Sequence, residues 1–200
     1  MRVKTEAKRE AILEMASQVF QEMGFERASM DEIAARMGGS KVTLYGYFAS
    51  KQQLFLEVTS HMGMRHLGPA FDELVPGSDD LPRMLRRFGE KFVAFICTPE
   101  ATGAYRLAVA QSGQSDIGRH FFELGPKRGE GVIAAFLQAE MDAGRLKDGG
   151  AAVAAMHLSA LLHAETAHRL LMGVSGPPTR QQVKQMVDRA VKVFLAAYAA

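Results

Sequence analysis

A short segment of the chain concentrates side chains that can hydrogen-bond to a polyanion. Between residues 40 and 47 it carries two hydroxyls, one ammonium group and two phenols, on Ser40, Lys41, Thr43, Tyr45 and Tyr47. Groups of these types bind phosphate oxygens and the edges of bases in a groove of duplex DNA. The chemistry suggested by this segment is therefore recognition of a nucleic acid, with no bond made or broken.

The elements that must position these side chains are two short helices joined by a tight turn. Ser29 is placed to cap the first helix, and Glu32 can return the hydrogen bond in a capping box. Close helix crossing requires a small residue, which Ala34 supplies, and Gly38 with the glycine after it permits the positive backbone angles of a turn. A second helix, capped by its serine, is then predicted over residues 41–48.

A longer helix is predicted on each side of this pair. The first runs from Thr5 to Met23 with apolar residues on one stripe, and Gly24 ends it so that Phe25 can fold back onto the stripe. The second starts after the capping residue Ser50 and continues to about Met64. Lys51 lies in its first turn, where an ammonium group and the helix dipole can bind one phosphate together.

Composition and charge exclude several classes of protein. Hydrophobic residues make up 48% of the chain and charged residues 23%. No apolar run is long enough to span a bilayer, so we expect a cytoplasmic protein with no membrane partner. The single cysteine, Cys97, agrees with a reducing compartment. Net charge is only +2, but four of the first nine residues are basic and can form an arm toward DNA: Arg2, Lys4, Lys8 and Arg9.

Helical periodicity continues to the end of the chain, which predicts an all-α fold of about nine helices. Beyond residue 64 the predicted helices cover residues 84–96, 101–111, 116–123, 126–143, 151–172 and 179–199. We expect a three-helix DNA-binding domain over residues 1–50 and a larger helical domain over residues 51–200, which would sense a ligand and form a dimer.

The last two predicted helices are candidates for the dimer contact. A single helix-turn-helix makes few contacts with DNA, so proteins of this build pair to bind two half-sites of a palindromic operator. Small and apolar residues at helical spacing suit such a seam: Ala151, Ala152, Ala154, Ala155, Ala160, Ala164, Val183, Met186, Val187, Ala190, Phe194, Ala197 and Tyr198. The alternative is that these helices cover only their own core.

Aromatic and sulfur-containing side chains in the larger domain are candidates for a ligand cavity. They are Phe88, Phe92, Phe95, Tyr105, Phe121, Phe122, Met156 and His157. The same pattern is also typical of a plain hydrophobic core. His157 and His168 are eleven positions apart, about 16 Å along a helix, too far to share a metal ion, so we expect neither a metal site nor another cofactor.

The run ASMDEIAARMGGSKVTLYGYFASKQQLF resembles the DNA-binding domain of the TetR/AcrR family of transcriptional regulators. The resemblance rests on Thr43-Leu44-Tyr45, Tyr47-Phe48 and Ser50-Lys51, and it extends more weakly into the second half of the chain. It implies that the DNA surface is lined by Ser40, Lys41, Val42, Thr43, Tyr45, Tyr47 and Lys51, with Leu44 and Phe48 in the core. Gly39 and Gly46 depart from the family pattern, where larger residues are usual.

These observations predict a dimeric, sequence-specific DNA-binding regulator, most simply a repressor released from its operator by a small apolar or amphipathic ligand. Two other classes are alternatives. A helical-bundle enzyme is disfavoured because the chain lacks the nucleophile elbow, phosphate loop and paired metal motifs that such chemistry needs. A DNA-bound scaffold that recruits another protein and senses no ligand is separated from a regulator by a thermal-shift ligand screen.

Overall fold

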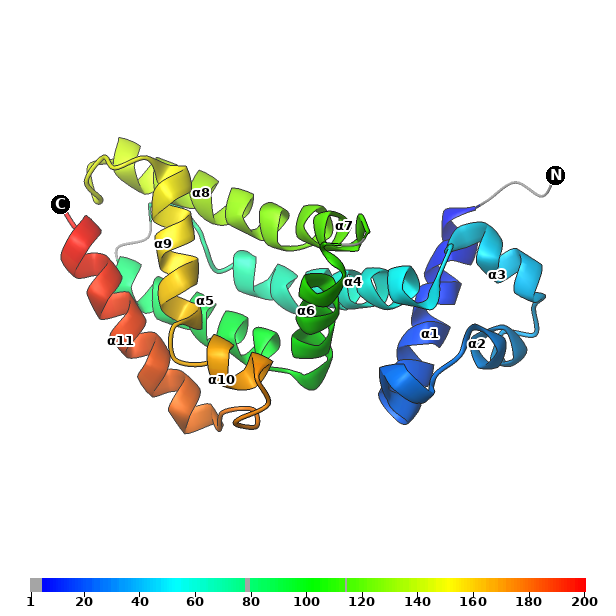
Figure 1. Cartoon of the computed structure of the whole chain (residues 1–200). Coiled ribbons are helices and arrows are strands. Elements are labelled where there is room, and N and C mark those ends of the chain that lie inside the picture. Colours follow the sequence, from blue (N-terminus) through cyan, green and yellow to red (C-terminus); the bar gives the residue numbers. More distant parts are fainter. Residues whose placement is uncertain (1–4, 78–79, 114) are drawn as a thin grey trace. The chain divides into compact units, whose positions relative to one another are not determined.

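The computed structural model describes residues 5–77, 80–113 and 115–200, and helices dominate all three stretches (Figure 1). The helices are α1 (Glu6–Arg27), α2 (Met30–Arg36), α3 (Lys41–Tyr47), α4 (Lys51–Phe71), α5 (Leu81–Ile96), α6 (Pro99–Gln111), α7 (Ile117–Leu124), α8 (Pro126–Asp142), α9 (Ala151–His163), α10 (Ala167–Leu171) and α11 (Arg180–Tyr198). The predicted all-α class is confirmed. Within the described residues, no helix is long and apolar enough to cross a membrane.

The chain forms two compact units. One contains residues up to 62 together with Gly103–Leu124, and the other contains Gly63–Thr102 together with Gly125–Ala200. Helices α4 and α6 each contribute residues to both units, so the chain passes from one unit to the other inside a helix at these two places.

The first unit is built on the apolar stripe of α1. Thr5 caps this helix by accepting from the backbone N–H of Lys8 at 3.3 Å, and the stripe is buried against α2, α3 and α4. Gly24 breaks the helix with a φ of 74°, but one more helical turn follows before the helix ends at Arg27. Phe25 folds back as predicted, with its ring 4.8 Å from that of Phe55.

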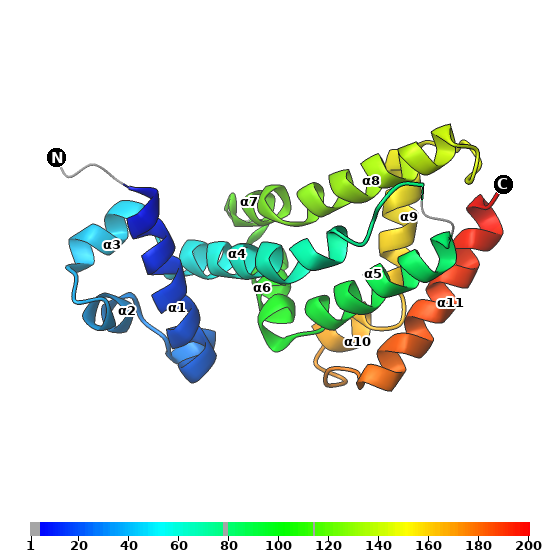
Figure 2. The ribbon, with the colours of Figure 1, turned by 180° about the vertical axis from the view of Figure 1, so that it is seen from behind.

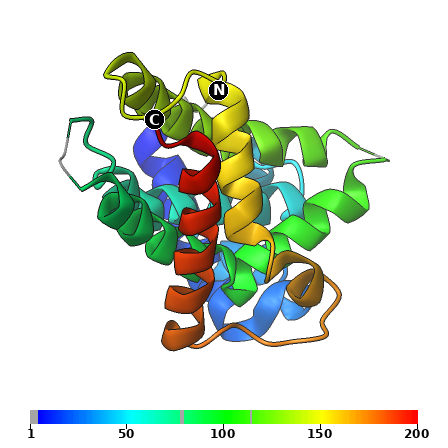
Figure 3. The same ribbon diagram turned by 90° about the vertical axis from the view of Figure 1, so that its left-hand side faces the viewer.

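The second unit packs four long helices around one core. Helices α5, α8, α9 and α11 supply most of its buried residues, and α11 lies alongside both α5 and α9 (Figures 2 and 3). Phe88, Leu85 and Phe194 are among the fully buried side chains. Such interdigitated apolar side chains stabilise the unit by removing their surface from water.

Two predicted helices have different bounds in the structure. Helix α4 continues to Phe71, past Pro69, although a proline usually marks the end of a helix. The helix predicted over residues 151–172 is two helices, because the chain turns after His163. There the buried Thr166 hydroxyl donates to the His163 carbonyl at 3.3 Å, which satisfies the end of α9. The described residues therefore form eleven helices where about nine were expected.

Candidate nucleic-acid interface

The turn between α2 and α3 has the backbone geometry that its glycines predict. Gly38 has a φ of 60°, a left-handed conformation that favours glycine. Its N–H donates to the Ala35 carbonyl at 3.0 Å, and the Gly39 N–H donates to the Ala34 carbonyl at 3.1 Å. These bonds end α2 and turn the chain sharply, so that the α3 cap follows two residues after Gly38.

A small apolar core holds the two helices together. Ile33 and Ala34 on α2 are buried, as are Leu44 at the centre of α3 and Phe48 at its end. This confirms the predicted inward face of both helices. Because one face of α3 is occupied by this core, its opposite face is left to carry whatever function the helix has.

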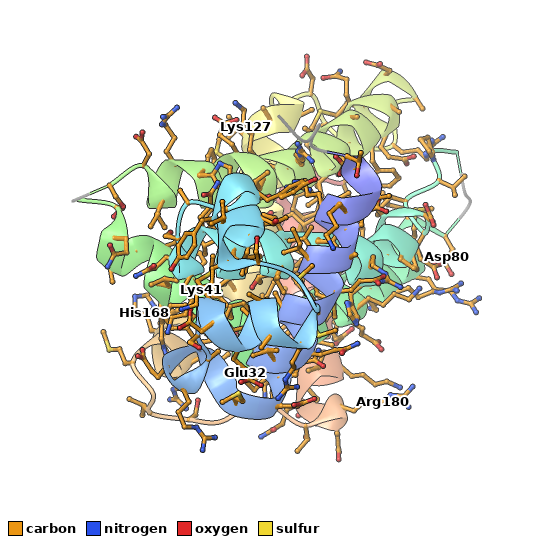
Figure 4. All side chains as sticks on the ribbon, turned by 90° about the vertical axis from the view of Figure 1, so that its right-hand side faces the viewer. Glu32, Lys41, Asp80, Lys127, His168 and Arg180 are labelled. Atoms are coloured by element: carbon orange, nitrogen blue, oxygen red, sulfur yellow. The ribbon has the colours of Figure 1, made fainter. Side chains whose placement is uncertain are left out.

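The start of α2 differs in one detail from the predicted capping box. Ser29 Oγ accepts from the Glu32 N–H at 3.1 Å, but the Glu32 carboxylate accepts from Arg36 Nε at 2.7 Å instead of reaching back to the cap (Figure 4). Hydrogen bonds from Arg36 to Glu22 and to Glu32 raise the pKa of the guanidinium above its ordinary value. Arg36 therefore links α2 to α1 as a permanent cation.

The outward face of α3 exposes Val42 and Tyr45. Their exposed fractions are 82% and 51%, and both side chains leave the helix on the side away from Leu44. Lys41 is also exposed, but its Nζ lies 2.6 Å from Asp31 Oδ2 on α2 (Figure 4). An exposed pair of this kind contributes little stability, so the Lys41 ammonium can exchange Asp31 for a phosphate at small cost.

The remaining polar residues of α3 take part in contacts within the chain. Ser40 Oγ accepts from the Thr43 N–H at 3.2 Å and lies 3.0 Å from Thr43 Oγ1. The Tyr47 hydroxyl accepts from the Thr5 N–H at 3.0 Å, which links the end of α3 to the start of α1. The hydroxyls of Ser40 and Thr43 stay at the surface. Tyr47 is half-buried, and its hydroxyl helps to hold α1 and α3 together.

The Lys51 side chain turns inward, toward the end of α1. Its Nζ donates to the carbonyls of Phe25, Ala28 and Glu26 at 2.8, 3.1 and 3.3 Å, and it lies 4.3 Å from the centre of the Phe25 ring. An ammonium group has three N–H donors, and three carbonyl acceptors can use all of them. The geometry therefore supports a role for Lys51 in holding α1 and α4 together, and the phosphate contact stays a prediction.

One polar residue that the sequence reasoning missed is Glu57, whose side chain on α4 is only 8% exposed. Its carboxylate pairs with the Arg9 guanidinium of α1 and lies 3.3 Å from Gln53 Nε2 and 3.4 Å from His120 Nε2 of α7. The sequence could have indicated this residue, because it is a single acid inside the apolar run LFLEV and a buried carboxylate needs a partner. Arg9 is thus an internal partner, and two other members of the predicted basic arm, Arg2 and Lys4, lie outside the described residues.

The eight candidate ligand residues are divided between the two units. Phe88 and Phe92 are stacked 5.6 Å apart in the second unit, and Phe92 also meets the His163 ring edge-on at 5.4 Å. In the same unit Phe95 stacks on His66, whereas Met156 and His157 lie exposed on α9. The other three belong to the first unit: Tyr105, Phe121 and Phe122.

Helices α9 and α11 lie side by side (Figure 3), and most of the residues predicted for the seam are not on their exposed faces. Seven of the thirteen predicted residues are buried inside their own unit: Ala151, Ala154, Ala155, Val183, Val187, Ala190 and Phe194. The exposed apolar residues are Ala152, Val153, Met156 and Ala160 on α9 and Val193, Ala196 and Ala197 on α11. Each of these two neighbouring helices thus exposes small and apolar side chains.

A helix-turn-helix with an exposed second helix, in an all-helical chain, defines a DNA-binding transcriptional regulator. Comparison with known families agrees. The profile described as "Bacterial regulatory proteins, tetR family" matches residues 12–58, and that of the "AefR-like transcriptional repressor, C-terminal domain" matches residues 83–200. The chain belongs to the TetR family of bacterial regulatory proteins, and it is a regulator rather than an enzyme.

Individual relatives support the same assignment. The chain is 38% identical over 102 residues to the HTH-type transcriptional activator FasR of Mycolicibacterium smegmatis, a match that covers 48% of this chain and 43% of FasR. It therefore spans less than half of that relative's length. Among solved structures, a putative TetR-family regulator from Mesorhizobium loti superposes with a TM-score of 0.83 at 24% identity, covering 98% of this chain and all of the other. The flavonoid-responsive regulator FrrA superposes with a TM-score of 0.68 at 29% identity, covering 98% of each chain.

Proposed function

We propose that this regulator binds a palindromic operator as a homodimer and leaves it when a small apolar or amphipathic ligand binds. The observation that carries the DNA-binding part is the outward face of α3, where Val42 and Tyr45 project from a helix anchored by Leu44. The proposed contacts to bases and phosphates come from Ser40, Lys41, Val42, Thr43, Tyr45 and Tyr47. We assign DNA binding to residues 1–50 and ligand response to residues 51–200.

The exposed surface of α9 and α11 supports the proposed dimer. Val153 is 43% exposed and Val193 is 55% exposed, and alanines lie near both on their helices. Small side chains let two pairs of helices approach closely, and apolar side chains at the surface gain from being covered. Two copies joined here would present two α3 helices to two half-sites of one operator.

The aromatic core of the second unit supports a ligand of low polarity. Phe88 and Phe92 stack on each other, and the His163 ring adds a polar edge beside Phe92. An aromatic wall with a few polar groups is typical of sites for small amphipathic molecules. The relative FrrA is described as flavonoid-responsive, which is a planar aromatic example of this class.

The direction of regulation has two candidates. The match of residues 83–200 to an AefR-like repressor domain favours repression. The relative FasR is described as an activator, which favours the alternative that operator binding recruits the transcription machinery. Transcription in vitro from a template that carries the operator separates them, because added protein lowers the transcript level in the first case and raises it in the second.

Selection of genomic fragments by the purified protein tests the proposal. We expect recovery of a palindromic sequence with half-sites about one helical turn apart, bound much more tightly than unrelated duplex. In a mobility-shift titration Tyr45→Phe should weaken binding to the recovered operator, while circular dichroism shows an unchanged fold. A folded protein without preference for any duplex at low salt would contradict the proposed function.

A further inference from the structure

The chain's own structure does not explain the glycine at position 46. Gly46 lies inside α3, where glycine costs about 1 kcal/mol relative to alanine. A Cβ built on it meets no described atom within 4 Å, and its φ is not positive. Neither packing nor backbone conformation requires a glycine there, and the glycine leaves this position on α3 open to whatever approaches from outside.

Val42 lies one helical turn before Gly46 on the same face of α3, since residues four apart are neighbours on a helix. Its exposed fraction of 82% is the highest among the exposed large hydrophobic residues of the described chain. The adjacent Lys41 side chain is drawn toward Asp31 on α2, and the hydroxyls of Ser40 and Thr43 bond to each other. The outward face of α3 therefore combines a protruding isopropyl group with a neighbouring position that has no side chain.

Duplex DNA offers one apolar group that fits this combination. In the major groove, thymine presents its C5 methyl, while other base edges present hydrogen-bonding atoms. We propose that Val42 reads a thymine in each half-site by packing on this methyl group. Gly46 leaves the space into which that base edge or its backbone fits, so that α3 sits deep in the groove. This inference rests on the proposed function, because it concerns the same DNA-binding face.

Replacement of thymine by deoxyuridine tests the methyl contact, because it removes only the methyl group. Each thymine of the selected operator is replaced in turn, symmetrically in both half-sites. At one position we expect the wild-type affinity to fall by about fourfold for each methyl group lost. Val42→Ala should bind the unmodified operator more weakly and should not distinguish thymine from deoxyuridine at that position. Val174→Ala, at another exposed valine, should behave like the wild type.

The Gly46→Ala variant tests the missing side chain at position 46. Its melting temperature and its operator affinity should change in opposite directions. The added methyl meets nothing in the free protein, so it should raise the melting temperature through helix propensity. The same methyl should weaken operator binding at least severalfold, because it fills the space that DNA needs. Gly131→Ala is the matched control inside α8, where a Cβ also meets no described atom, and it should raise the melting temperature without changing operator affinity.

The outcomes separate this inference from the proposed function. A protein that selects an operator but shows a flat deoxyuridine scan overturns the inference alone. So does Val42→Ala with the full wild-type penalty for deoxyuridine, or Gly46→Ala with unchanged operator affinity. A protein that selects no duplex at all contradicts both the inference and the function on which it rests.

Discussion

At the scale of single residues, hydrogen bonds inside the chain divide the cations near α3 into two kinds. Lys51 directs its ammonium group to three backbone carbonyls, and Arg9 pairs with the buried Glu57. Lys41 forms an exposed pair with Asp31 that a phosphate can replace. Inward-facing cations stabilise the DNA-binding part, whereas outward-facing ones are available for DNA.

This division predicts different effects for two lysine substitutions. Lys51→Ala should lower the melting temperature and leave the salt dependence of operator binding as in the wild type, because three backbone carbonyls already use its N–H donors. Lys41→Ala should leave the melting temperature nearly unchanged and flatten the slope of log affinity against log salt by about 0.9 for each of the two copies in the dimer. Mobility-shift titrations between low and moderate salt measure both slopes. A flatter slope for Lys51→Ala, together with a normal melting temperature, would instead support the predicted contact between Lys51 and a phosphate.

The buried carboxylate of Glu57 predicts a second effect. Glu57→Gln removes the charge that faces the Arg9 guanidinium, so the free energy of unfolding should fall by about 1–3 kcal/mol in urea titrations. Glu6→Gln is the matched control, because Glu6 also pairs with Arg9 but is well exposed, and it should cost less than about 1 kcal/mol. An equal fall in the free energy of unfolding for the two variants would show that the buried pair stabilises the fold no more than the exposed pair does.

At the scale of elements, a buried ion pair ties the end of α8 to two loops. Glu140 accepts from Arg145 Nε at 2.6 Å and from a second guanidinium nitrogen at 2.8 Å, and it accepts from the Gly77 N–H at 3.1 Å. The hydrogen bonds from Arg145 hold the pKa of Glu140 below its ordinary value, against the opposing effect of burial. The charged carboxylate thus fixes both the turn after α8 and the loop before α5.

The lowered pKa predicts how stability depends on pH. Because the folded pKa of Glu140 is depressed, its contribution is fully present above the unfolded value of about 4.3 and is lost as pH falls through the folded pKa. Glu140→Gln should therefore be less stable than the wild type at pH 7, and the difference should shrink in acid. Thermal unfolding at a series of pH values measures it. A stability difference between Glu140→Gln and the wild type that stays constant with pH would refute the linkage.

At the scale of the whole molecule, the proposed operator binding depends on the proposed dimer. Alanines and valines make up part of the exposed surface of α9 and of the last turns of α11, whereas the exposed residues in the earlier turns of α11 are polar. A stable interface buries on the order of 800 Å² on each partner, so a charge at its centre would be desolvated without a partner.

Val153→Asp should therefore dissociate the proposed dimer. Sedimentation velocity should show a monomer, and operator affinity should fall by about tenfold or more because each copy then binds one half-site alone. The control is Val174→Asp, at an exposed valine outside both helices, which should remain dimeric and bind normally. A Val153→Asp protein that stays dimeric would place the interface elsewhere.

Sequence by itself determined the features that depend on near neighbours in the chain. The caps at Ser29 and Ser40, the turn at Gly38 and the inward face with Ala34 and Leu44 follow from local hydrogen bonds and helical periodicity. These interactions span a few residues, so their geometry is nearly the same in any fold that contains them. The helix-turn-helix and its family resemblance were therefore recognisable from the order of the residues alone.

Only the tertiary structure decided which side chains are buried or bonded to other parts of the same chain. The inward turn of Lys51, the pairing of Arg9 with Glu57 and the burial of Ala154 depend on residues far away in sequence. Helical periodicity gives the face on which a residue lies but not the element that covers that face. An ammonium group or a methyl group contacts its partner only after separate helices have packed. The spacing of residues along one helix does not predict that packing.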